Sequence, residues 1–296
     1  MEELGILWCL QQRSRRLSMR NLDTPKANTW CPACGNFGIL NAVKAGFKQL
    51  FDQGLDPAKL MITCGIGCHG KIFDYLNISG IYGLHGRAVA TASGIKLANP
   101  ELTVVSFGGD GDSLGEGLEH TLFAAKRNLD MTLILHNNGN YGLTTGQFSP
   151  LSPIGFRGLS TPQGSAEQPF DAIPLLLAAG ASFVARSYSA NPKHLAEILV
   201  KAVMHRGFSF IEVLQPCVSY NNTYQYYNSR IKMLDQIPSD VYEAMRLAKD
   251  KDHSYLGIYQ AEKRDLFEDL SSGFANPVKE SPAFRERIET LRTMYK

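Results

Sequence analysis

Short apolar runs alternate with longer amphipathic segments along most of this chain, from residue 36 to about residue 285. The runs predict strands, and several of them are rich in Val and Ile. They are Leu60–Thr63, Thr103–Phe107, Met131–Leu135, Ser182–Ala185 and Phe208–Leu214. Strands that are apolar throughout suit a parallel sheet that is covered on both faces.

The segments between these runs have the spacing of apolar residues that is typical of helices. They are Gly38–Phe51, Ala88–Ala98, Leu114–Arg127, Ala172–Ala179 and Pro192–His205, followed near the end by Phe284–Met294. Strands that alternate with helices predict βαβ units joined by right-handed crossovers. We therefore expect an α/β fold, a mostly parallel sheet flanked by helices.

Three segments depart from this alternation. Residues 1–28 contain a basic run, and we expect a flexible leader in which Met19 is an alternative start. The segment Gly146–Pro169 is rich in Pro, Gly and Ser and is too long for a simple connector, which favours a functional loop. Residues 228–296 are more charged. We expect them to form an extension that packs on the main domain, residues 29–227, or on a partner subunit.

The composition is ordinary for a globular protein, with 44% hydrophobic and 20% charged residues and a net charge of +2. It gives no sign of nucleic-acid binding, and no apolar run approaches the roughly 20 residues that span a bilayer. Met1–Leu10 lacks the features of a secretory signal, so we expect a cytoplasmic protein. Six cysteines are too few for a disulfide scaffold and indicate metal ligands or buried thiols. Cys9, in the leader, is expected to be unliganded.

A turn rich in glycine and aspartate, Gly108–Asp112, follows directly on the predicted strand Thr103–Phe107. In open α/β sheets, ligands bind beyond the carboxyl ends of the strands. Glycines there let the backbone approach a phosphate, and the N-terminus of the following helix offers free N–H donors. Asp110 adds a hard oxygen ligand. A carboxylate beside a diphosphate indicates Mg²⁺.

A second polar cluster, His136–Gly142, closes the next predicted strand. Asn138 and Asn140 offer side-chain and backbone oxygens that can complete a metal sphere. A Gly-Asp-Gly at one strand end and an Asn-Asn at the end of the next resemble the thiamine-diphosphate motif. The alternative is that both are ordinary βα turns, in which Gly, Asp and Asn are favoured.

Cysteine spacing gives a further candidate site. Cys31 and Cys34 form a CxxC pair, which suits zinc, an iron–sulfur cluster or a redox disulfide. A four-ligand site needs two more thiolates, from Cys64, Cys68 and Cys217. Cys68 and Cys217 follow predicted strands and therefore lie at the same edge of the sheet as the Gly-Asp-Gly turn. Cys64 ends its strand and is expected in the core.

Several separated segments resemble the β subunits of 2-oxoacid:ferredoxin oxidoreductases, in the family's order and over roughly residues 29–262. They are WCPACGNFG from Trp30, GIGCHGK from Gly65, LHGRA from Leu84, GGDGD from Gly108, NYGLT from Asn140 and LQPC from Leu214. The resemblance implies the fold of the diphosphate-binding half of thiamine-diphosphate enzymes.

The resemblance also implies ligands for each group. A 4Fe–4S cluster falls on Cys31, Cys34, Cys68 and Cys217. Mg²⁺ falls on Asp110, Asn138 and, through a backbone carbonyl, Asn140. Contacts to thiamine diphosphate fall on Ile66, Gly67, Cys68, His69, Gly83, Leu84, His85, Gly86, Gly111, Asp112, Gly142 and Leu143. Cations that could meet phosphate or a substrate carboxylate fall on Lys71 and Arg87, and His85, between Gly83 and Gly86, is the third catalytic candidate.

This sequence also departs from the family pattern. Ala33 stands where many relatives have Gly, Cys64 and His69 stand where Ser is common, and Asn137 stands where Asp is frequent. Cys64 is therefore a rival ligand for the cluster, ranked below Cys68. None of these departures touches the implied metal residues.

The implied activity is the coenzyme A-dependent oxidative decarboxylation of a 2-oxo acid, such as pyruvate or 2-oxoglutarate, to acyl-CoA and CO₂, with electrons passing through the cluster to ferredoxin. Members of the family need an α subunit, or a fused γα subunit, to bind the other end of thiamine diphosphate. No second domain of that type fits in this chain. We therefore expect a separate α subunit docked on a large apolar surface, and no activity without it.

Two other classes remain open at this stage. One is a non-oxidative thiamine-dependent decarboxylase component with structural zinc on its cysteines. The other is a non-catalytic metal-binding electron carrier in which the Gly-Asp-Gly turn is only a turn. Metal analysis distinguishes the first, and cofactor binding distinguishes the second.

Overall fold

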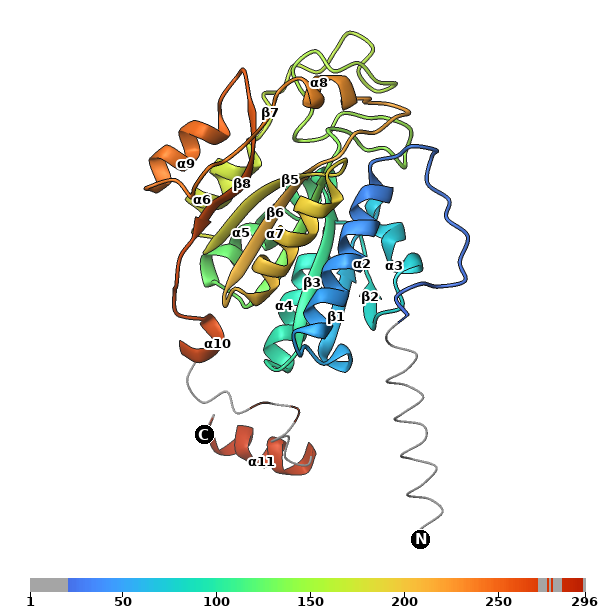
Figure 1. Cartoon of the computed structure of the whole chain (residues 1–296). Coiled ribbons are helices and arrows are strands. Elements are labelled where there is room, and N and C mark those ends of the chain that lie inside the picture. Colours follow the sequence, from blue (N-terminus) through green and yellow to red (C-terminus); the bar gives the residue numbers. More distant parts are fainter. Residues whose placement is uncertain (1–20, 271–275, 277, 279–283, 295–296) are drawn as a thin grey trace.

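The computed structural model of this protein describes residues 21–270, 276, 278 and 284–294, so that Cys9, Met19 and most of the expected leader lie outside it. The strands are β1 Leu60–Cys64, β2 Gly80–Tyr82, β3 Thr103–Gly109, β4 Met131–Asn137, β5 Phe183–Tyr188, β6 Phe208–Leu214, β7 Ile231–Met233 and β8 Ser254–Ala261. Within the described chain they form an eight-stranded sheet in the order β2-β1-β3-β4-β6-β5-β8-β7 (Figure 1).

Neighbouring strands of this sheet run parallel except for β5 and β8, which are antiparallel. The expected mostly parallel sheet is therefore confirmed. Residues 231–261, within the predicted extension, supply β7 and β8 and so extend the same sheet. Residues 21–28 lie beside α2 Asn36–Asp52 and α3 Ile72–Tyr75, where Leu22 is buried and Asp23 pairs with Lys44.

Helices cover both faces of the sheet (Figure 1). On one face lie α2, α3 and α7 Pro192–Met204. On the other lie α4 Ala88–Ala98, α5 Leu118–Arg127, α6 Ala172–Ala178 and α9 Val241–Ala248. The remaining helices are α8 Tyr224–Asn228, α10 Phe267–Leu270 and α11 Phe284–Met294. None of the helices in the described ranges combines the length and apolar character that crossing a bilayer requires.

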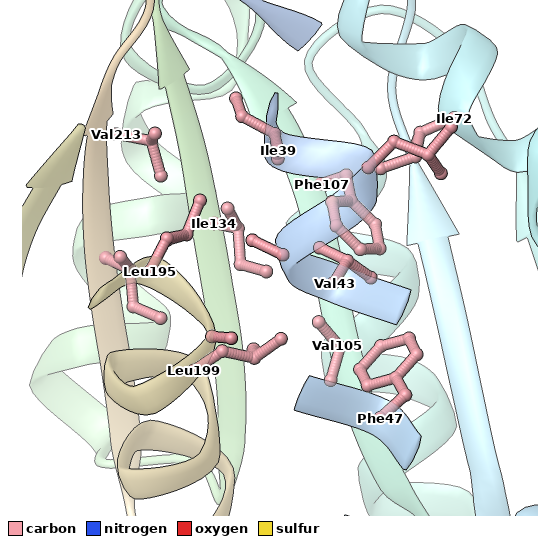
Figure 2. Packing of buried hydrophobic residues seen from close by; sticks show 14 of the residues in the cluster. Ile39, Val43, Phe47, Ile72, Val105, Phe107, Ile134, Leu195, Leu199 and Val213 are labelled. Atoms are coloured by element: carbon pink, nitrogen blue, oxygen red, sulfur yellow. The ribbon is translucent and has the colours of Figure 1, made fainter. Parts of the chain in front are cut away.

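The core follows from the two periodicities of the sequence. Ile39, Val43 and Phe47 recur every fourth residue of α2 and so lie on one side of it. They pack against Val105 and Phe107 of β3, which alternate along the strand and point to the same face (Figure 2). Because apolar residues fill both faces of the central strands, the sheet is fixed between two helical layers.

The structure corrects one predicted boundary. The segment predicted as a single helix over Leu114–Arg127 begins instead with a π-helical turn at Asp112–Glu116, and the α-helix α5 starts at Leu118. Gly115 and Gly117 favour this break, because glycine weakens a helix interior. Single π-helical turns are frequent at functional sites.

Candidate functional site

A cleft with about 410 Å³ of empty space lies beyond the carboxyl ends of β1, β3 and β4. It contains most of the residues predicted to hold the cofactor and its metal. Those lining it are Ile66, Gly67, Cys68, His69, His85, Asp110, Gly111, Asp112, Asn138, Asn140, Gly142 and Leu143, with Gly109, Tyr141 and Thr144 in addition. Loops from separate strand ends meet here because parallel strands all end at one edge of the sheet.

Apart from three of the cysteines, five of the predicted site residues lie outside this cleft. The Gly83 amide donates to the Cys64 carbonyl and the Gly86 amide to Oδ1 of Asp112, and the side chain of Leu84 is 76% exposed. Lys71 lines a neighbouring pocket. The Arg87 side chain donates hydrogen bonds to the carbonyls of Gly86 and Glu116, which places it against the backbone rather than in the cleft.

Asp110 lies at the floor of the cleft and is 1% exposed. The Ser149 hydroxyl donates a hydrogen bond to its Oδ2. Burial raises the pKa of Asp110 to about 6, although this hydrogen bond acts in the opposite direction. A divalent cation beside the carboxylate would favour its ionised form, because a bound cation reverses the local effect of burial. Asp110 is thus suited to a metal-ligand role.

Asp112 joins three loops of the cleft. Its Oδ1 accepts hydrogen bonds from the backbone amides of Ile66 at 3.2 Å and Gly86 at 2.7 Å. Nδ1 of His85 lies 3.2 Å from the same oxygen, and Nε2 of His69 lies 3.6 Å from Oδ2. The carboxylate therefore holds the strand-end loops of β1 and β2 against the turn after β3.

Hydrogen bonds within the turn after β4 hold Asn138 and Asn140, which both line the cleft. The Asn140 amide donates to Oδ1 of Asn138 at 3.0 Å, and the Asn140 side chain donates to the Asn138 carbonyl at 3.0 Å. Asn221 donates to that carbonyl as well, at 2.8 Å. Oδ1 of Asn140 is buried without a hydrogen-bond partner in the described chain. With the Asp110 carboxylate, this unpaired oxygen fits the hard-oxygen preference of Mg²⁺.

His85 and Tyr141 line the cleft, and both contact Glu116. The Tyr141 hydroxyl donates to both carboxylate oxygens of Glu116 at 3.2 Å, and Nδ1 of His85 lies 3.2 Å from Oε2 of Glu116. Burial, followed by the Glu116 charge, raises the pKa of Tyr141. Tyr141 therefore acts here as a neutral hydrogen-bond donor.

A second pocket adjoins the cleft and contains the predicted cysteine ligands. Cys31, Cys34, Cys68 and Cys217 all line it. The CxxC segment forms a tight turn in which the Cys34 amide donates to the Cys31 carbonyl at 3.0 Å and Ala33 has φ +62°. A position with positive φ suits glycine best, so Ala33 holds a backbone conformation that is unfavourable for a residue with a side chain.

Burial favours the protonated form of two of these thiols, Cys34 and Cys68. It raises the pKa of Cys34 to about 11 and also raises the pKa of Cys68. A metal centre would displace those protons, because it binds thiolates. Cys64 lies 0% exposed in β1 and does not line the pocket. The structure thus brings together the four preferred cysteines and leaves the rival in the core.

The two pockets share one wall. Cys68, Asn138 and Gly142 line both of them. A Cβ atom on Gly142 would lie 3.6 Å from Sγ of Cys217 and 3.7 Å from Sγ of Cys68. A centre on the cysteines would therefore lie directly beside a ligand in the cleft.

Nowhere in the described part of the chain do three Cys, His, Asp or Glu side chains converge as they would around a single metal ion.

Several residues of the site were not predicted. Ser149 and Ser152 come from the loop Gly146–Pro169, and the Ser152 hydroxyl donates to the Gly139 carbonyl at 2.6 Å. The repeated Ser-Pro pairs in that loop were the available signal. Gln215 and Ser219 flank Cys217 and reach the sulfurs of the CxxC pair.

Two protein-family models match this chain. Residues 65–213 match the model described as the C-terminal TPP-binding domain of thiamine pyrophosphate enzymes. Residues 217–276 match the model described as the C-terminal part of the pyruvate ferredoxin oxidoreductase β subunit. The first match spans the cleft residues, and the second begins at Cys217.

Curated and solved proteins are also similar to it. The 2-oxoacid:ferredoxin oxidoreductase subunit β of Saccharolobus solfataricus is 49% identical over 216 residues, 72% of this chain and 70% of that one. Subunit β of 2-oxoacid:ferredoxin oxidoreductase 1 from Aeropyrum pernix is 40% identical over 268 residues, 90% of this chain and 83% of that one. The solved 2-oxoglutarate:ferredoxin oxidoreductase of Magnetococcus marinus, with 2-oxoglutarate, coenzyme A and succinyl-CoA bound, superposes with a TM-score of 0.84 at 32% identity, covering 92% of this chain and 95% of that one.

Proposed function

Because the chain belongs to the family of 2-oxoacid:ferredoxin oxidoreductase β subunits, we propose that it binds thiamine diphosphate with Mg²⁺ and carries one 4Fe–4S cluster. The complete enzyme would convert a 2-oxo acid and coenzyme A to acyl-CoA and CO₂ while it reduces ferredoxin. The observation that carries this proposal is the wall that the cleft and the cysteine pocket share, built from Cys68, Asn138 and Gly142. This wall would bring thiamine diphosphate, the source of electrons, into contact with the cluster that accepts them.

In the cleft, Asp110, Asn138 and Asn140 would hold Mg²⁺, and the Gly111 turn would hold the diphosphate. The carboxylate of Asp112 already fixes the Ile66 and Gly86 amides and so shapes the cavity before any ligand enters. When bound, thiamine diphosphate supplies the nucleophile for the 2-oxo carbon and accepts the electron pair released with CO₂.

In the second pocket, the thiolates of Cys31, Cys34, Cys68 and Cys217 would hold the cluster, which supplies one-electron transfer. The Trp30 side chain donates to the Cys68 carbonyl at 2.6 Å and holds that loop in place. The five cysteines in the described ranges are free thiols. Free thiols persist in a reducing compartment, and we place the protein in the cytoplasm.

Lys71 and His85 are the side chains that we assign to the substrate carboxylate. His85 lines the cleft, and Lys71 lines the adjoining pocket beside Cys68. Arg87 would act indirectly, because it grips the carbonyls of Gly86 and Glu116 and thus holds the loop that carries His85.

The α subunit would close the open side of the cleft. Large apolar side chains are exposed on β2 and on loops that follow β2 and β4: Ile81 at 43%, Tyr82 at 42%, Leu84 at 76%, Leu143 at 44% and Leu159 at 81%. Exposed apolar surface of this kind marks protein interfaces. We assign this surface to the α subunit, which would supply the rest of the thiamine site.

The experiment is anaerobic co-purification of this chain with its α subunit, followed by iron, sulfide and thiamine analysis and an assay of ferredoxin reduction with pyruvate and 2-oxoglutarate. We expect about four irons and four sulfides per chain, one thiamine diphosphate, and ferredoxin reduction that requires both a 2-oxo acid and coenzyme A. Zinc in place of iron would instead favour a non-oxidative thiamine decarboxylase component. A complex that binds Mg²⁺ but no thiamine diphosphate would overturn the proposal.

A further inference from the structure

Two side chains on the segment after β6 donate hydrogen bonds to cysteine sulfurs. The Ser219 hydroxyl donates to Sγ of Cys31 at 3.2 Å. The Gln215 side-chain amide donates to Sγ of Cys34 at 3.6 Å. Both donors flank Cys217. The short segment 215–219 therefore supplies one cysteine and, in addition, one hydrogen-bond donor for each sulfur of the CxxC pair.

Backbone contacts hold this segment in place. The Gln215 amide donates to the Asn137 carbonyl at 2.8 Å, and the Gly35 amide donates to the Pro216 carbonyl at 3.2 Å. Cys217 and Asn221 exchange backbone hydrogen bonds at 2.9 and 3.1 Å. The two donors are therefore positioned by the fold itself.

The two donors have different environments. Gln215 is 1% exposed, and its Oε1 has no hydrogen-bond partner among the described residues. Ser219 and Cys31 are both exposed. The interaction of buried Gln215 with Cys34 is screened less by solvent. At the surface, water competes with the Ser219 hydroxyl for the sulfur of Cys31. The shorter contact, from Ser219, therefore acts on the sulfur of Cys31, and the more buried contact, from Gln215, acts on the sulfur of Cys34.

We propose that Gln215 and Ser219 are positioning residues that set the reduction potential of the iron–sulfur cluster by donating hydrogen bonds to the sulfurs of Cys34 and Cys31. This inference rests on the proposed function, since it requires the cluster. Reduction adds one negative charge to the centre, and a hydrogen-bond donor to a ligand sulfur stabilises that charge. Both donors therefore favour the reduced cluster and raise its potential.

The test is a redox titration of the anaerobically purified αβ complex, in which electron paramagnetic resonance follows the reduced cluster and iron content is measured in parallel. The variants are Ser219→Ala, Ser219→Thr, which keeps a hydroxyl, and Gln215→Leu, which keeps much of the volume without a donor. Ser229→Ala is the matched control, because the Ser229 hydroxyl donates to the Tyr226 carbonyl and contacts no cysteine in the described structure.

We expect Ser219→Ala and Gln215→Leu to lower the equilibrium constant for one-electron reduction by on the order of tenfold, or about 59 mV. Ser219→Thr and Ser229→Ala should keep the potential of the unaltered complex. Full iron content with an unchanged potential in both Ser219→Ala and Gln215→Leu would overturn the inference. An unaltered complex without a cluster would instead overturn the proposed function. If Gln215→Leu loses iron, the exposed Ser219 still decides the question.

Discussion

The side-chain amide of Asn137 donates a hydrogen bond of 2.7 Å to Oε1 of Glu212, across the pairing of β4 with β6. Oε2 of Glu212 accepts a second bond of 2.7 Å from Nε of Arg186, and Glu212 is only 3% exposed. The turn that begins at Asn138 is therefore anchored to a buried ion pair. An Asp at position 137 would place a second carboxylate against Glu212, whereas Asn supplies a donor.

Removal of the Glu212 charge should destabilise the protein strongly, because it leaves Arg186 buried without a counter-ion. We expect Glu212→Leu to lower the free energy of unfolding by about 3–5 kcal/mol, as measured by denaturant titration. The control is Asp269→Leu, which breaks the exposed pair with Arg206 and should cost at most about 1 kcal/mol. Equal losses in the two variants would refute the role assigned to burial.

Gly65→Ala should disrupt the cleft. A Cβ atom there would lie 2.0 Å from Oδ2 of Asp112, a carboxylate that the Ile66 and Gly86 amides hold in place. We expect a loss of about 1–3 kcal/mol in the free energy of unfolding and no retained thiamine diphosphate. Gly94→Ala is the matched control. Position 94 lies in α4 with no atom within 4 Å of the added Cβ. The free energy of unfolding of this variant should therefore rise by about 0.5–1 kcal/mol. A Gly65→Ala complex that still holds the cofactor would contradict the expectation.

Ser149→Ala should weaken the binding of Mg²⁺ and thiamine diphosphate. It removes the hydroxyl that orients the Asp110 carboxylate, and a hydrogen bond to a charged group contributes about 1.5–3 kcal/mol. We therefore expect the dissociation constant of the αβ complex for thiamine diphosphate, measured by calorimetry at fixed Mg²⁺, to rise about tenfold or more. Ser160→Ala, at an exposed position of the same loop, should leave it unchanged. An equal dissociation constant in the two variants would show that Ser149 does not contribute to cofactor binding.

Acidification should destabilise the protein through His194 and His205. Burial lowers the pKa of both side chains, although Glu197 and Asp130 oppose it and Lys201 reinforces it at His194. The unfolded chain then binds more protons below about pH 6.5, so stability is complete above that pH and falls as pH drops toward the folded pKa values. Each histidine should contribute a slope of up to about 1.4 kcal/mol per pH unit in that window.

The check is denaturant unfolding at several pH values between 5 and 7.5. The double variant His194→Asn, His205→Asn should show a shallower decline than the unaltered protein. The variant would lose the contacts of the His194 ring with Ser187 and of the His205 ring with Ser182, each 2.8 Å long. This loss would lower the free energy of unfolding at every pH. Only the slope of the free energy of unfolding against pH is therefore informative. Identical slopes in the variant and the unaltered protein would contradict the role given to His194 and His205.

The central elements could be predicted because their apolar patterns are long and unbroken. The structure reproduces β6 Phe208–Leu214 and α4 Ala88–Ala98 with the predicted bounds. β2 and β7 were missed, since each has three residues and lies partly exposed. β8 was also missed; it mixes polar and apolar positions and pairs antiparallel with β5. No local pattern indicates that such a segment extends a parallel sheet.

Within the site, the rule that ligands gather at carboxyl ends of strands was enough to place Asp110 and Asn138 in one cleft. Contacts from loops could not be predicted in this way. Ser149 reaches Asp110 only through the path that the loop Gly146–Pro169 takes, and Ser219 reaches Cys31 only because two distant segments meet. Such contacts depend on three-dimensional packing, which the local sequence does not encode.

The strand order has a consequence for the synthesis of the protein. Cys31 and Cys34 leave the ribosome early, whereas Cys217 follows β6, which pairs with β4 between segments far apart in the chain. A nascent chain therefore displays Cys31, Cys34 and the apolar edge of β4 long before β6 and Cys217 have emerged. Insertion of the proposed cluster would then be a late event, and premature release or oxidation of the unfinished chain would be the hazard that its assembly has to avoid.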